Sequence, residues 1–342
     1  MTDRVKVLYI LGWKRSGSTI LGNLIGEIDG FFHSGELRTL WGQGLLGGRL
    51  CGCGRAVTDC DFWSGVVATV MRTSGRAGVE QVFAWQREAV RMRRFRSLLR
   101  PDVSSNEGPL GSYATVTADL YRAIADRGGS NVVVDSSKQP ADAALASRLP
   151  GIDTFYLHLV RDPRAVAYSW QRRKPSPGEG EREEMMRVSP ARSSANWMAV
   201  NCAAEIIRRR AGPGRTLLVR YEDFVSSPQA ILEAAARLVG EEYRPIPEPR
   251  PGSFRIGANH TAGGNPARFV GGVVRLRVDD EWIVRQSPRD RRTSTLVALP
   301  LLSRYGYQIA PRAVAAPDDH MLDSGTRREP MIVKRVGKSD EG

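Results

Sequence analysis

Residues 5–28 read VKVLYILGWKRSGSTILGNLIGEI, and this stretch decides the fold. The apolar run Val5–Leu11 has the length of a buried strand and ends at Gly12. A polar loop follows, and from Ile20 to Ile28 apolar residues recur at helical spacing. Backbone N–H groups in such a loop, with a helix N-terminus behind them, form a cradle for a phosphate-like anion. The stretch therefore predicts a strand, a loop and a helix that together bind an anion.

The loop Gly12–Thr19 (GWKRSGST) differs from the loop of nucleotide triphosphatases. Those enzymes place a lysine just before the final Ser or Thr, where it reaches the β- and γ-phosphates. Ser18 occupies that position here, and the basic residues lie upstream. We expect the loop to bind an anion without acting on a γ-phosphate; a tight turn with incidental glycines is the alternative. The residues expected to contact the anion are Lys14, Arg15, Ser16, Gly17, Ser18 and Thr19.

The rest of the chain alternates between apolar runs of strand length and segments with helical spacing. The expected strands are 132–134, 154–160 and 216–219, and the expected helices are 79–99, 112–127, 140–149, 193–210, 227–239 and 289–304, with one more opening at Asp162-Pro163. This alternation predicts an α/β fold with a largely parallel sheet covered on both faces. Ligands of such sheets bind beyond the carboxyl ends of the strands. Three loops that follow strands, 12–19, 135–138 and 161–163, are therefore expected to share one cleft.

We expect a single domain over residues 1–310. Irregular or helical insertions at about 41–127 and 171–192 match no substrate pattern and are expected to form the site of a second substrate. The segment 174–191 is polar and broken by proline and glycine, which predicts a mobile surface loop that orders over the cleft when ligands bind. The tail 311–342 is expected to be disordered.

The 342-residue chain carries a formal net charge of +13, which is unusual for a globular protein. Nucleic acid, an acidic membrane surface and a polyanionic small ligand could each use such a charge. Much of the excess lies in arginines between residues 91 and 100, on a segment whose Val90, Phe95, Leu98 and Leu99 form an apolar stripe. No base-stacking aromatic residues are interleaved with these arginines, so the pattern favours a solvated helix face over a nucleic-acid site.

Nothing in the sequence resembles a secretion signal or a membrane span. Val5–Leu11 is too short to cross a bilayer and lacks a cleavage site, and no later stretch approaches about eighteen apolar residues. We therefore expect a cytoplasmic protein with reduced cysteines and no membrane insertion.

Three of the four cysteines cluster at Cys51, Cys53 and Cys60, whereas Cys202 lies far away in a helical pattern. A zinc site would need a fourth ligand, and no His or Cys supplies one at zinc-finger spacing. A disulfide and a structural thiol loop are the other interpretations. We expect no metal, and the role of the cluster stays open.

A second motif occupies residues 159–170, which read LVRDPRAVAYSW. Arg161 stands at the end of an expected strand, and Ser169 lies about two turns into the following helix. A guanidinium and a hydroxyl in these positions can hold one terminal phosphate from two sides. A surface ion pair between Arg161 and Asp162 is the alternative.

Together the two loops resemble the sulfotransferase superfamily. Arg15–Thr19 (RSGST) is similar to the family's 5′-phosphosulfate loop, and Arg161 with Ser169 is similar to its 3′-phosphate motif. The residues of these motifs are most similar to those of the branch that includes carbohydrate and tyrosylprotein sulfotransferases and their bacterial relatives. The resemblance covers roughly residues 5–270. The resemblance implies a P-loop-like three-layer α/β fold, 3′-phosphoadenosine-5′-phosphosulfate (PAPS) as the donor, and no metal requirement.

Two more stretches fit the family's pattern. Tyr221, in 219–223 (VRYED), follows an expected strand and is either a nucleotide contact or a packed core ring. The segment 260–269 (HTAGGNPARF) resembles the loop that closes over the nucleotide in bacterial members. Arg268 would then contact the donor, although the glycines and the Asn-Pro pair of this segment would also suit a plain turn.

Sulfuryl transfer needs a cation at the leaving oxygen and a base for the acceptor hydroxyl. Lys138, after the strand at 132–134, resembles the family's catalytic lysine; a surface lysine is the alternative. Glu36, in Ser34-Gly35-Glu36-Leu37, resembles the glutamate that serves as the base in this branch. His33 is its competitor, and His158 lies within an expected strand, as a core histidine would.

The expected activity is transfer of a sulfuryl group from PAPS to a hydroxyl of a small-molecule, carbohydrate or lipid-linked acceptor by in-line displacement. One rival is a kinase that holds Mg²⁺ at Asp135; a kinase needs magnesium, whereas a sulfotransferase tolerates its removal. Another rival is a non-catalytic nucleotide- or nucleic-acid-binding module, which has no use for Lys138 and Glu36 converging on one atom. The acceptor and the oligomeric state stay open.

Overall fold

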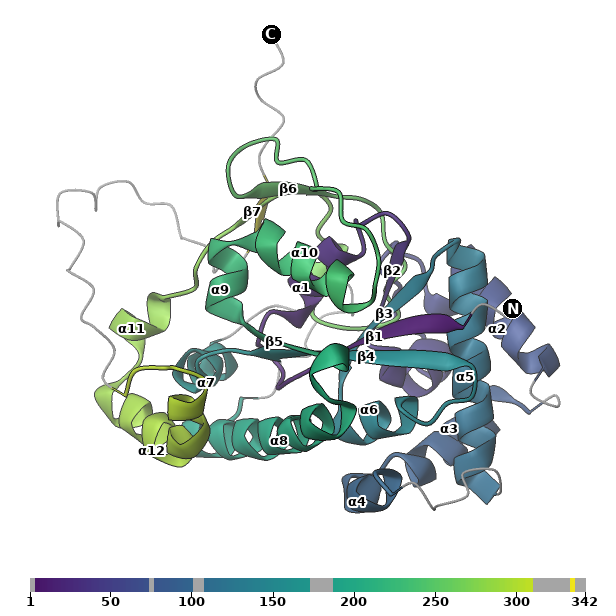
Figure 1. Cartoon of the computed structure of the whole chain (residues 1–342), viewed down its shortest axis with the longest axis horizontal. Helices are drawn as coiled ribbons and strands as arrows, with labels where there is room; N and C mark the ends of the chain where they lie inside the picture. The colour runs from purple at the N-terminus through teal and green to yellow at the C-terminus, as the bar shows by residue number, and fades with distance from the viewer. Residues whose placement is uncertain (1–3, 74–76, 101–107, 173–186, 310–332, 336–342) are drawn as a thin grey trace, which may run out of the picture.

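The structure of the chain is a computed structural model that describes residues 4–73, 77–100, 108–172, 187–309 and 333–335. At its centre lies a five-stranded parallel sheet in the order β2-β3-β1-β4-β5 (Figure 1). The strands are β1 (Val5–Leu11), β2 (Phe31–Gly35), β3 (Val132–Lys138), β4 (Ile152–Val160) and β5 (Thr216–Arg220). The expected parallel α/β sheet is thereby confirmed.

Alternating side chains of β1 enter two separate cores, because successive residues of a strand face opposite sides of the sheet. Val7 and Tyr9 belong to one core, and Leu8 and Ile10 belong to the other. The helices that flank the sheet are α1 (Ser18–Ile25), α9 (Tyr221–Ser226) and α10 (Pro228–Leu238) on the Leu8 side, and α5 (Gly108–Gly128), α6 (Pro140–Ala146) and α8 (Pro190–Ala211) on the Tyr9 side. The result is a three-layer sandwich (Figure 1).

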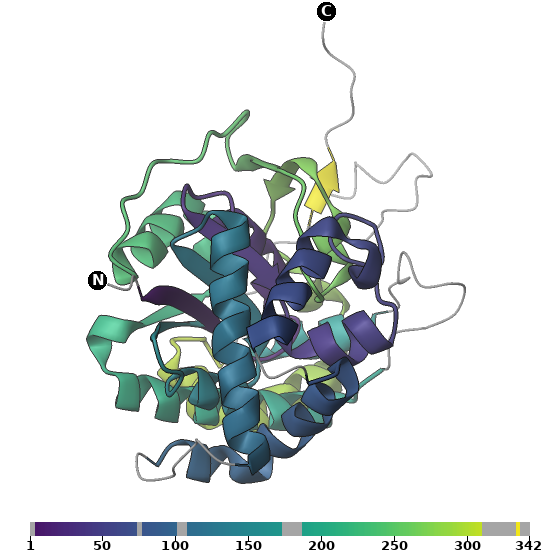
Figure 2. The same ribbon diagram turned by 90° about the vertical axis from the view of Figure 1, so that its right-hand side faces the viewer.

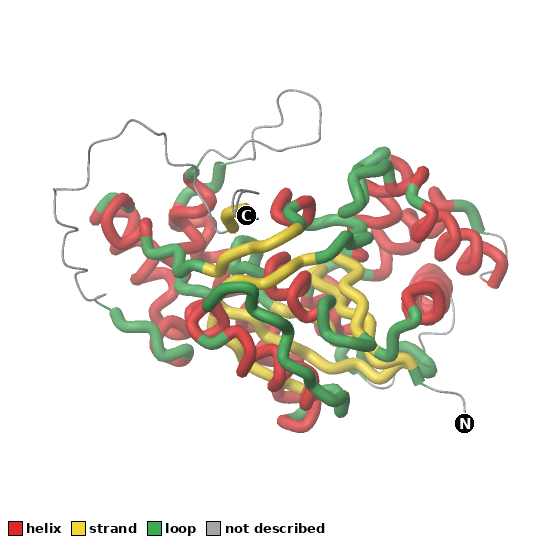
Figure 3. The backbone as a smooth tube through the Cα atoms, turned by 90° about the horizontal axis from the view of Figure 1, so that it is seen from above, coloured by secondary structure: helices red, strands yellow, loops and turns green. Residues whose placement is uncertain are grey.

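Further helices lie at the two ends of the sheet. At one end are α2 (Asp61–Thr73), α3 (Val79–Ala89) and α4 (Phe95–Leu98), which gather with α5 (Figure 2). At the other end are α7 (Pro163–Gln171), α11 (Glu281–Arg285) and α12 (Pro288–Arg304). Seen from above, the strands lie between these two groups of helices (Figure 3).

The expected helix at 79–99 divides into α3, a 3₁₀ turn and α4. Of the apolar stripe, Val90, Phe95 and Leu98 are buried and Leu99 is partly buried. Four arginines of this segment are exposed, which fits the expected solvated face: Arg91, Arg93, Arg96 and Arg100. The irregular stretch at 41–63 contains a π-helical segment at Leu40–Leu46, a 3₁₀ turn at Val57–Asp59 and the start of α2.

A second, three-stranded antiparallel sheet is built from β6 (Ser253–Ile256), β7 (Gly272–Leu276) and β8 (Val333–Arg335). Its Phe254 and Val274 pack into the same core as α1. Most of the expected disordered tail lies outside the described residues, and β8 falls within that tail. Residues 174–186 of the expected mobile loop also lie outside them, and its last two residues, Pro190 and Ala191, belong to α8. Among the described residues, no helix is long and apolar enough to cross a membrane.

Candidate active site

The anion loop lies between β1 and α1, as the sequence predicts. Gly17 is the N-cap of α1 and has φ 90°, a conformation that glycine adopts without a steric cost. A Cβ at Gly17 would also lie 2.5 Å from the ring of Tyr221. Gly17 is therefore required both by its backbone conformation and by the close approach of Tyr221.

The side chains of this loop are unequally exposed. Lys14 is exposed, whereas Ser16 is 1% exposed and its Oγ has no hydrogen-bond partner among the described residues. Buried hydroxyls normally have a partner, so the Ser16 hydroxyl is available to a bound group. The guanidinium of Arg15 lies 5.0 Å from the ring centre of Trp170. Burial and the nearby Arg172 lower the pKa of Arg15 to about 10, which leaves it protonated at neutral pH.

Arg161 follows β4 directly and reaches the anion loop. Its Nη1 donates to the carbonyl oxygen of Arg15 at 3.1 Å, and its guanidinium lies 4.5 Å from the ring centre of Tyr221. Asp162 caps α7 by accepting a hydrogen bond from Arg164 N–H, so the predicted helix start is confirmed. Ser169 is buried on α7. The two sequence motifs therefore meet at the carboxyl ends of β1 and β4.

Asp279, which no sequence pattern indicated, binds both Arg161 and Arg172. Asp279 Oδ2 lies 2.9 Å from Arg161 Nη2 and 2.8 Å from Arg172 Nη2. Burial raises the pKa of Asp279, but the two guanidiniums lower it more, and the net pKa lies below its usual value. Asp279 follows β7, a strand that no sequence pattern predicted, so nothing in the sequence indicated this contact.

Lys138 and Glu36 form an ion pair beside the same sheet edge. Lys138 Nζ donates to Glu36 Oε1 at 2.7 Å and to the carbonyl oxygen of Ser136 at 2.7 Å. Lys138 is 4% exposed and has φ 67°, a left-handed conformation that few non-glycine residues adopt. Strand β3 runs to Lys138 rather than ending at Asp135, and the left-handed turn ends it.

The ionisation of Glu36 is set by two opposing effects. Burial raises the pKa of Glu36, but the Lys138 ammonium, with Lys14 and Arg49 further away, lowers it more. The net pKa lies below its usual value, so Glu36 is a carboxylate at neutral pH.

His33 lies in the interior, between α1 and β3. Its Nδ1 pairs with Asn23 Oδ1 at 2.9 Å and its Nε2 with Ser136 Oγ at 3.0 Å. Burial and the charge of Lys138 lower the pKa of His33 to about 3, so the ring is neutral. Both ring nitrogens are occupied by protein groups, which disfavours His33 as a base. His158 is fully buried and pairs with Asn201 Oδ1 at 2.8 Å, in the core position expected of it.

The carboxylate of Asp135, which a kinase would use for Mg²⁺, faces the α5 side of the sheet. It accepts hydrogen bonds from Tyr121 Oη at 2.8 Å, Ser137 N–H at 2.8 Å and Ser137 Oγ at 2.5 Å. Three protein donors thus occupy this buried carboxylate.

The segment after β6 crosses over Glu36. Gly263 O accepts from Glu36 N–H at 3.2 Å, and Ala262 N–H donates to Ser34 O at 2.9 Å. Arg268 is buried in a 3₁₀ turn at Pro266–Phe269 and donates to the carbonyl oxygens of Gly264 and Leu50. The guanidinium of Arg268 therefore joins this segment to the insertion around residue 50.

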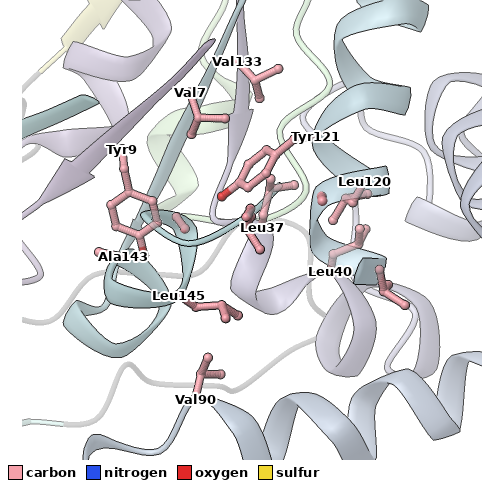
Figure 4. Packing of buried hydrophobic residues seen from close by; sticks show 14 of the residues in the cluster. Val7, Tyr9, Leu37, Leu40, Val90, Leu120, Tyr121, Val133, Ala143 and Leu145 are labelled. Carbon is pink, nitrogen blue, oxygen red and sulfur yellow. The ribbon is translucent and has the colours of Figure 1, made fainter. Parts of the chain in front are cut away.

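A small pocket lies between α5, α6 and the turn that follows Glu36. Leu37, Leu120, Tyr121 and Leu145 pack around this region, as Figure 4 shows. The polar residues that line it are Arg38, Tyr113, Thr117, Tyr121, Asp135, Ser137 and Asp142. Arg38 forms an ion pair with Asp142, a second contact that the sequence analysis missed. The pocket thus combines helix α5 of the predicted insertion with direct neighbours of Glu36 and Lys138.

No family model matches the chain, and no curated protein matches it significantly. The chain is similar to a sulfotransferase domain from the curacin biosynthetic pathway, at 18% identity and a TM-score of 0.47 over 89% of this chain and 98% of that one. It is also similar to the sulfotransferase domain of the Synechococcus PCC 7002 olefin synthase, at 19% identity and a TM-score of 0.47 over 90% of this chain and 96% of that one.

A sulfotransferase from Alicyclobacillus acidocaldarius is a third similar structure, at 12% identity and a TM-score of 0.40 over 88% of this chain and 94% of that one. All three are sulfotransferases, the family that the loop motifs resemble. Identities and TM-scores this low assign no activity to this chain, which has to be argued from its own side chains.

Proposed function

We propose that this protein is a sulfotransferase that moves a sulfuryl group from PAPS to an acceptor hydroxyl. One observation carries the proposal: the 2.7 Å ion pair of Lys138 and Glu36 lies at the same sheet edge as the anion loop. A proton acceptor and a cation side by side are the two groups that sulfuryl transfer requires.

The donor would be held by the two motifs that meet at the ends of β1 and β4. Loop 12–17 offers backbone N–H groups and the unpartnered hydroxyl of Ser16 to the phosphosulfate. Arg161 would bind the 3′-phosphate, together with Ser169. Asp279 binds Arg161 and Arg172, and we propose that the phosphate displaces this carboxylate. Tyr221 would act through packing against Gly17 and Arg161.

Every bond and proton of the transfer is accounted for by the donor, the acceptor and the side chains of the site. The acceptor oxygen forms a new bond to sulfur while the bond from sulfur to the bridging phosphate oxygen breaks, and adenosine 3′,5′-bisphosphate leaves. Glu36 takes the proton of the acceptor hydroxyl. Lys138 stabilises the negative charge that grows on the bridging oxygen, and this stabilisation is greater in the transition state than in the ground state.

The acceptor would approach from the side of the sheet that helix α5 covers, because α5 belongs to the insertion and Ser137 directly precedes Lys138. The pocket that Arg38, Tyr113 and Asp142 line on this side has room for about one water molecule, so it marks the side of approach and does not itself hold the acceptor.

The geometry favours transfer of a sulfuryl group over the two rival functions. The Asp135 carboxylate already accepts three hydrogen bonds from protein groups, which disfavours its use for a kinase's Mg²⁺. A non-catalytic binding module would gain nothing from burying the charge of Lys138 against Glu36, because desolvating an ion pair is costly.

The test is incubation with PAPS and a panel of alcohol, sugar and phenol acceptors, followed by mass spectrometry for sulfated products. We expect a sulfated product together with stoichiometric adenosine 3′,5′-bisphosphate, and turnover that does not depend on added Mg²⁺. The same panel with ATP and Mg²⁺ is the control. Phosphorylated product in the control, or no nucleotide binding at all, would refute the proposal.

A further inference from the structure

Three cysteines of the insertion converge with a histidine that lies 200 residues further along the chain. The Sγ atoms of Cys53 and Cys60 are 3.8 Å apart. His260 Nδ1 lies 3.3 Å from Cys60 Sγ and 3.8 Å from Cys51 Sγ. All four of these atoms lie within 4.8 Å of one another. No His or Cys lies at zinc-finger spacing in the sequence, but the fold brings in a fourth ligand from a distant segment.

The spacing of these four atoms fits a single tetrahedral ion. Zinc binds sulfur at about 2.3 Å and imidazole nitrogen at about 2.0–2.1 Å, which puts two sulfurs about 3.8 Å apart and a sulfur and a nitrogen about 3.5 Å apart. The observed 3.8 Å between the two sulfurs, and 3.3 and 3.8 Å between sulfur and nitrogen, lie close to these values. An iron–sulfur cluster would carry its thiolates on separate irons and spread them further.

Local structure holds the ligands in place independently of any ion. Cys51 and Cys53 lie in a tight turn in which Cys51 N–H donates to Arg55 O at 2.8 Å and Gly54 N–H donates to Cys51 O at 2.9 Å. Cys60 directly precedes α2. Cys51 and Cys60 are buried, so two of the sulfurs are shielded from water.

Helix α2 also fixes the histidine. Trp63 Nε1 donates to His260 O at 2.8 Å, and the ring of Phe62 stacks on the His260 ring at 5.1 Å between centres. Gly52 N–H donates to Thr261 O at 3.0 Å, and a Cβ at Gly52 would lie 1.9 Å from Asn259 Oδ1. Gly52 is therefore the residue that lets segment 259–261 approach the cysteine turn.

We propose that Cys51, Cys53, Cys60 and His260 bind one Zn²⁺ ion in a closed structural site. Soft thiolates with one imidazole select zinc over magnesium or calcium. Four protein ligands leave no open position, so the ion takes no part in group transfer. The inference holds whether or not the chain is a sulfotransferase.

The ion would connect residues 257–265, which pass over Glu36, to the cysteine-containing insertion at 51–60. His260 is followed by Thr261–Gly264, whose Ala262 and Gly263 bond to Ser34 and Glu36. A bond from zinc to His260 therefore limits how far this segment can lift away from Glu36. Removal of the ion is expected to speed up amide hydrogen exchange at residues 257–265, whereas exchange in β1, β3 and β4 should stay as slow as before.

The experiment measures bound metal in full-length protein purified without a metal-affinity step. We expect one zinc per chain by mass spectrometry of the metal, and a tetrahedral thiolate spectrum after cobalt substitution. Loss of even an outer-shell partner costs about 10–100-fold in metal affinity, so Cys53→Ser and His260→Ala are each expected to weaken zinc binding by at least about 100-fold. The matched control is Cys202→Ser, at an exposed cysteine on α8, which should keep its zinc.

Circular dichroism checks that each variant is folded, and His260→Cys, which restores a thiolate ligand, should rescue zinc binding. Hydrogen exchange with and without a chelator then tests the tie to residues 257–265. Zinc-free wild-type protein, a Cys53–Cys60 disulfide in the freshly purified chain, or equal zinc content in Cys53→Ser and Cys202→Ser would each overturn the site. If hydrogen exchange at residues 257–265 is the same with and without the chelator, the ion does not hold this segment against the insertion.

Discussion

Asp279 Oδ2 lies 2.9 Å from Arg161 Nη2, so the guanidinium expected to hold a phosphate already holds a carboxylate of the same chain. Arg172 binds the same oxygen at 2.8 Å, and Arg15 lies close enough for its pKa to be lowered by Arg172. Two guanidiniums therefore bind one internal carboxylate, and a third lies near one of them. Under the proposed function a nucleotide phosphate would compete with Asp279 for these guanidiniums, and this competition can be measured.

Arg161→Ala is expected to weaken binding of adenosine 3′,5′-bisphosphate. A hydrogen bond to a charged group contributes about 1.5–3 kcal/mol, which corresponds to about 10- to 150-fold in the dissociation constant. Calorimetry with the bisphosphate and with 5′-AMP measures the effect. In the wild-type protein the bisphosphate should bind more tightly than 5′-AMP, and the variant should bind both alike. Equal wild-type affinities would refute the assignment of Arg161 to the 3′-phosphate.

Asp279→Asn is expected to strengthen binding of the same nucleotide by about tenfold. The amide keeps the shape of the side chain but removes the charge that competes for the two guanidiniums, so less of the protein is held in a form that cannot bind. The neighbouring exposed Asp280→Asn is the matched control and should bind like the wild type. Weaker binding by Asp279→Asn would mean that Asp279 supports the nucleotide site instead of competing for it.

Glu36→Gln is expected to lower turnover on an alcohol acceptor by about 10²–10⁴-fold, because the amide cannot accept the hydroxyl proton. Donor affinity should change little. Glu80→Gln, on the exposed face of α3, controls for the loss of a negative charge. The alcohol is the informative acceptor, since a phenol ionises readily without a base. Near-normal alcohol turnover in a folded Glu36→Gln protein would exclude Glu36 as the base.

Lys138→Ala is expected to slow transfer by about 10²-fold or more and also to shift the acid limb of the rate profile. In the wild type the pKa of Glu36 lies below its usual 4.5, so the rate should be independent of pH near neutrality and fall only under more acidic conditions. Without the ammonium, the main cause that lowers the pKa of Glu36 is gone while burial still raises it, so this pKa rises. The limb then moves to higher pH. The measurement is the pH dependence of the rate for both proteins. If the rate falls at the same acidic pH in both, Lys138 does not set the pKa of Glu36.

His33→Gln is expected to lower thermal stability while the remaining folded protein keeps its pH profile. His33 bridges Asn23 and Ser136 in the interior, so an imperfect replacement leaves buried polar groups less well bonded, at a cost of about 1–3 kcal/mol. Thermal melts and rate profiles of the purified variant are the measurements. A lost acid limb with normal stability would reassign the base to His33.

Much of the fold could be predicted from the sequence, since β1 and β4 are mostly apolar runs between clear turn and cap residues. Strand β2 could not be predicted, because it is only five residues long and its polar His33 and Ser34 break the apolar pattern. Ser34 Oγ donates to Val134 O at 2.9 Å, and contacts of this kind are what allow polar residues to be buried in a central sheet.

The candidate site was predictable only where it depends on short local motifs. Lys138 and Glu36 were found separately, and their 2.7 Å contact depends on β2 and β3 being neighbours in the sheet. Asp279, and His260 as a partner of the cysteines, could not be found, because each meets its partners through long-range packing. Spacing along the chain carries no information about such contacts.

The order of the central sheet also determines when its middle strand can be paired during synthesis. Strand β1 is made before either neighbour, and β3 and β4 begin only at Val132 and Ile152. Until those residues leave the ribosome, the apolar run VKVLYIL has no strand beside it. Pairings this distant in sequence form slowly, and unpaired apolar strands are prone to aggregate. We therefore expect recovery of soluble protein to depend on chaperones that cover β1 until the second half of the sheet has emerged.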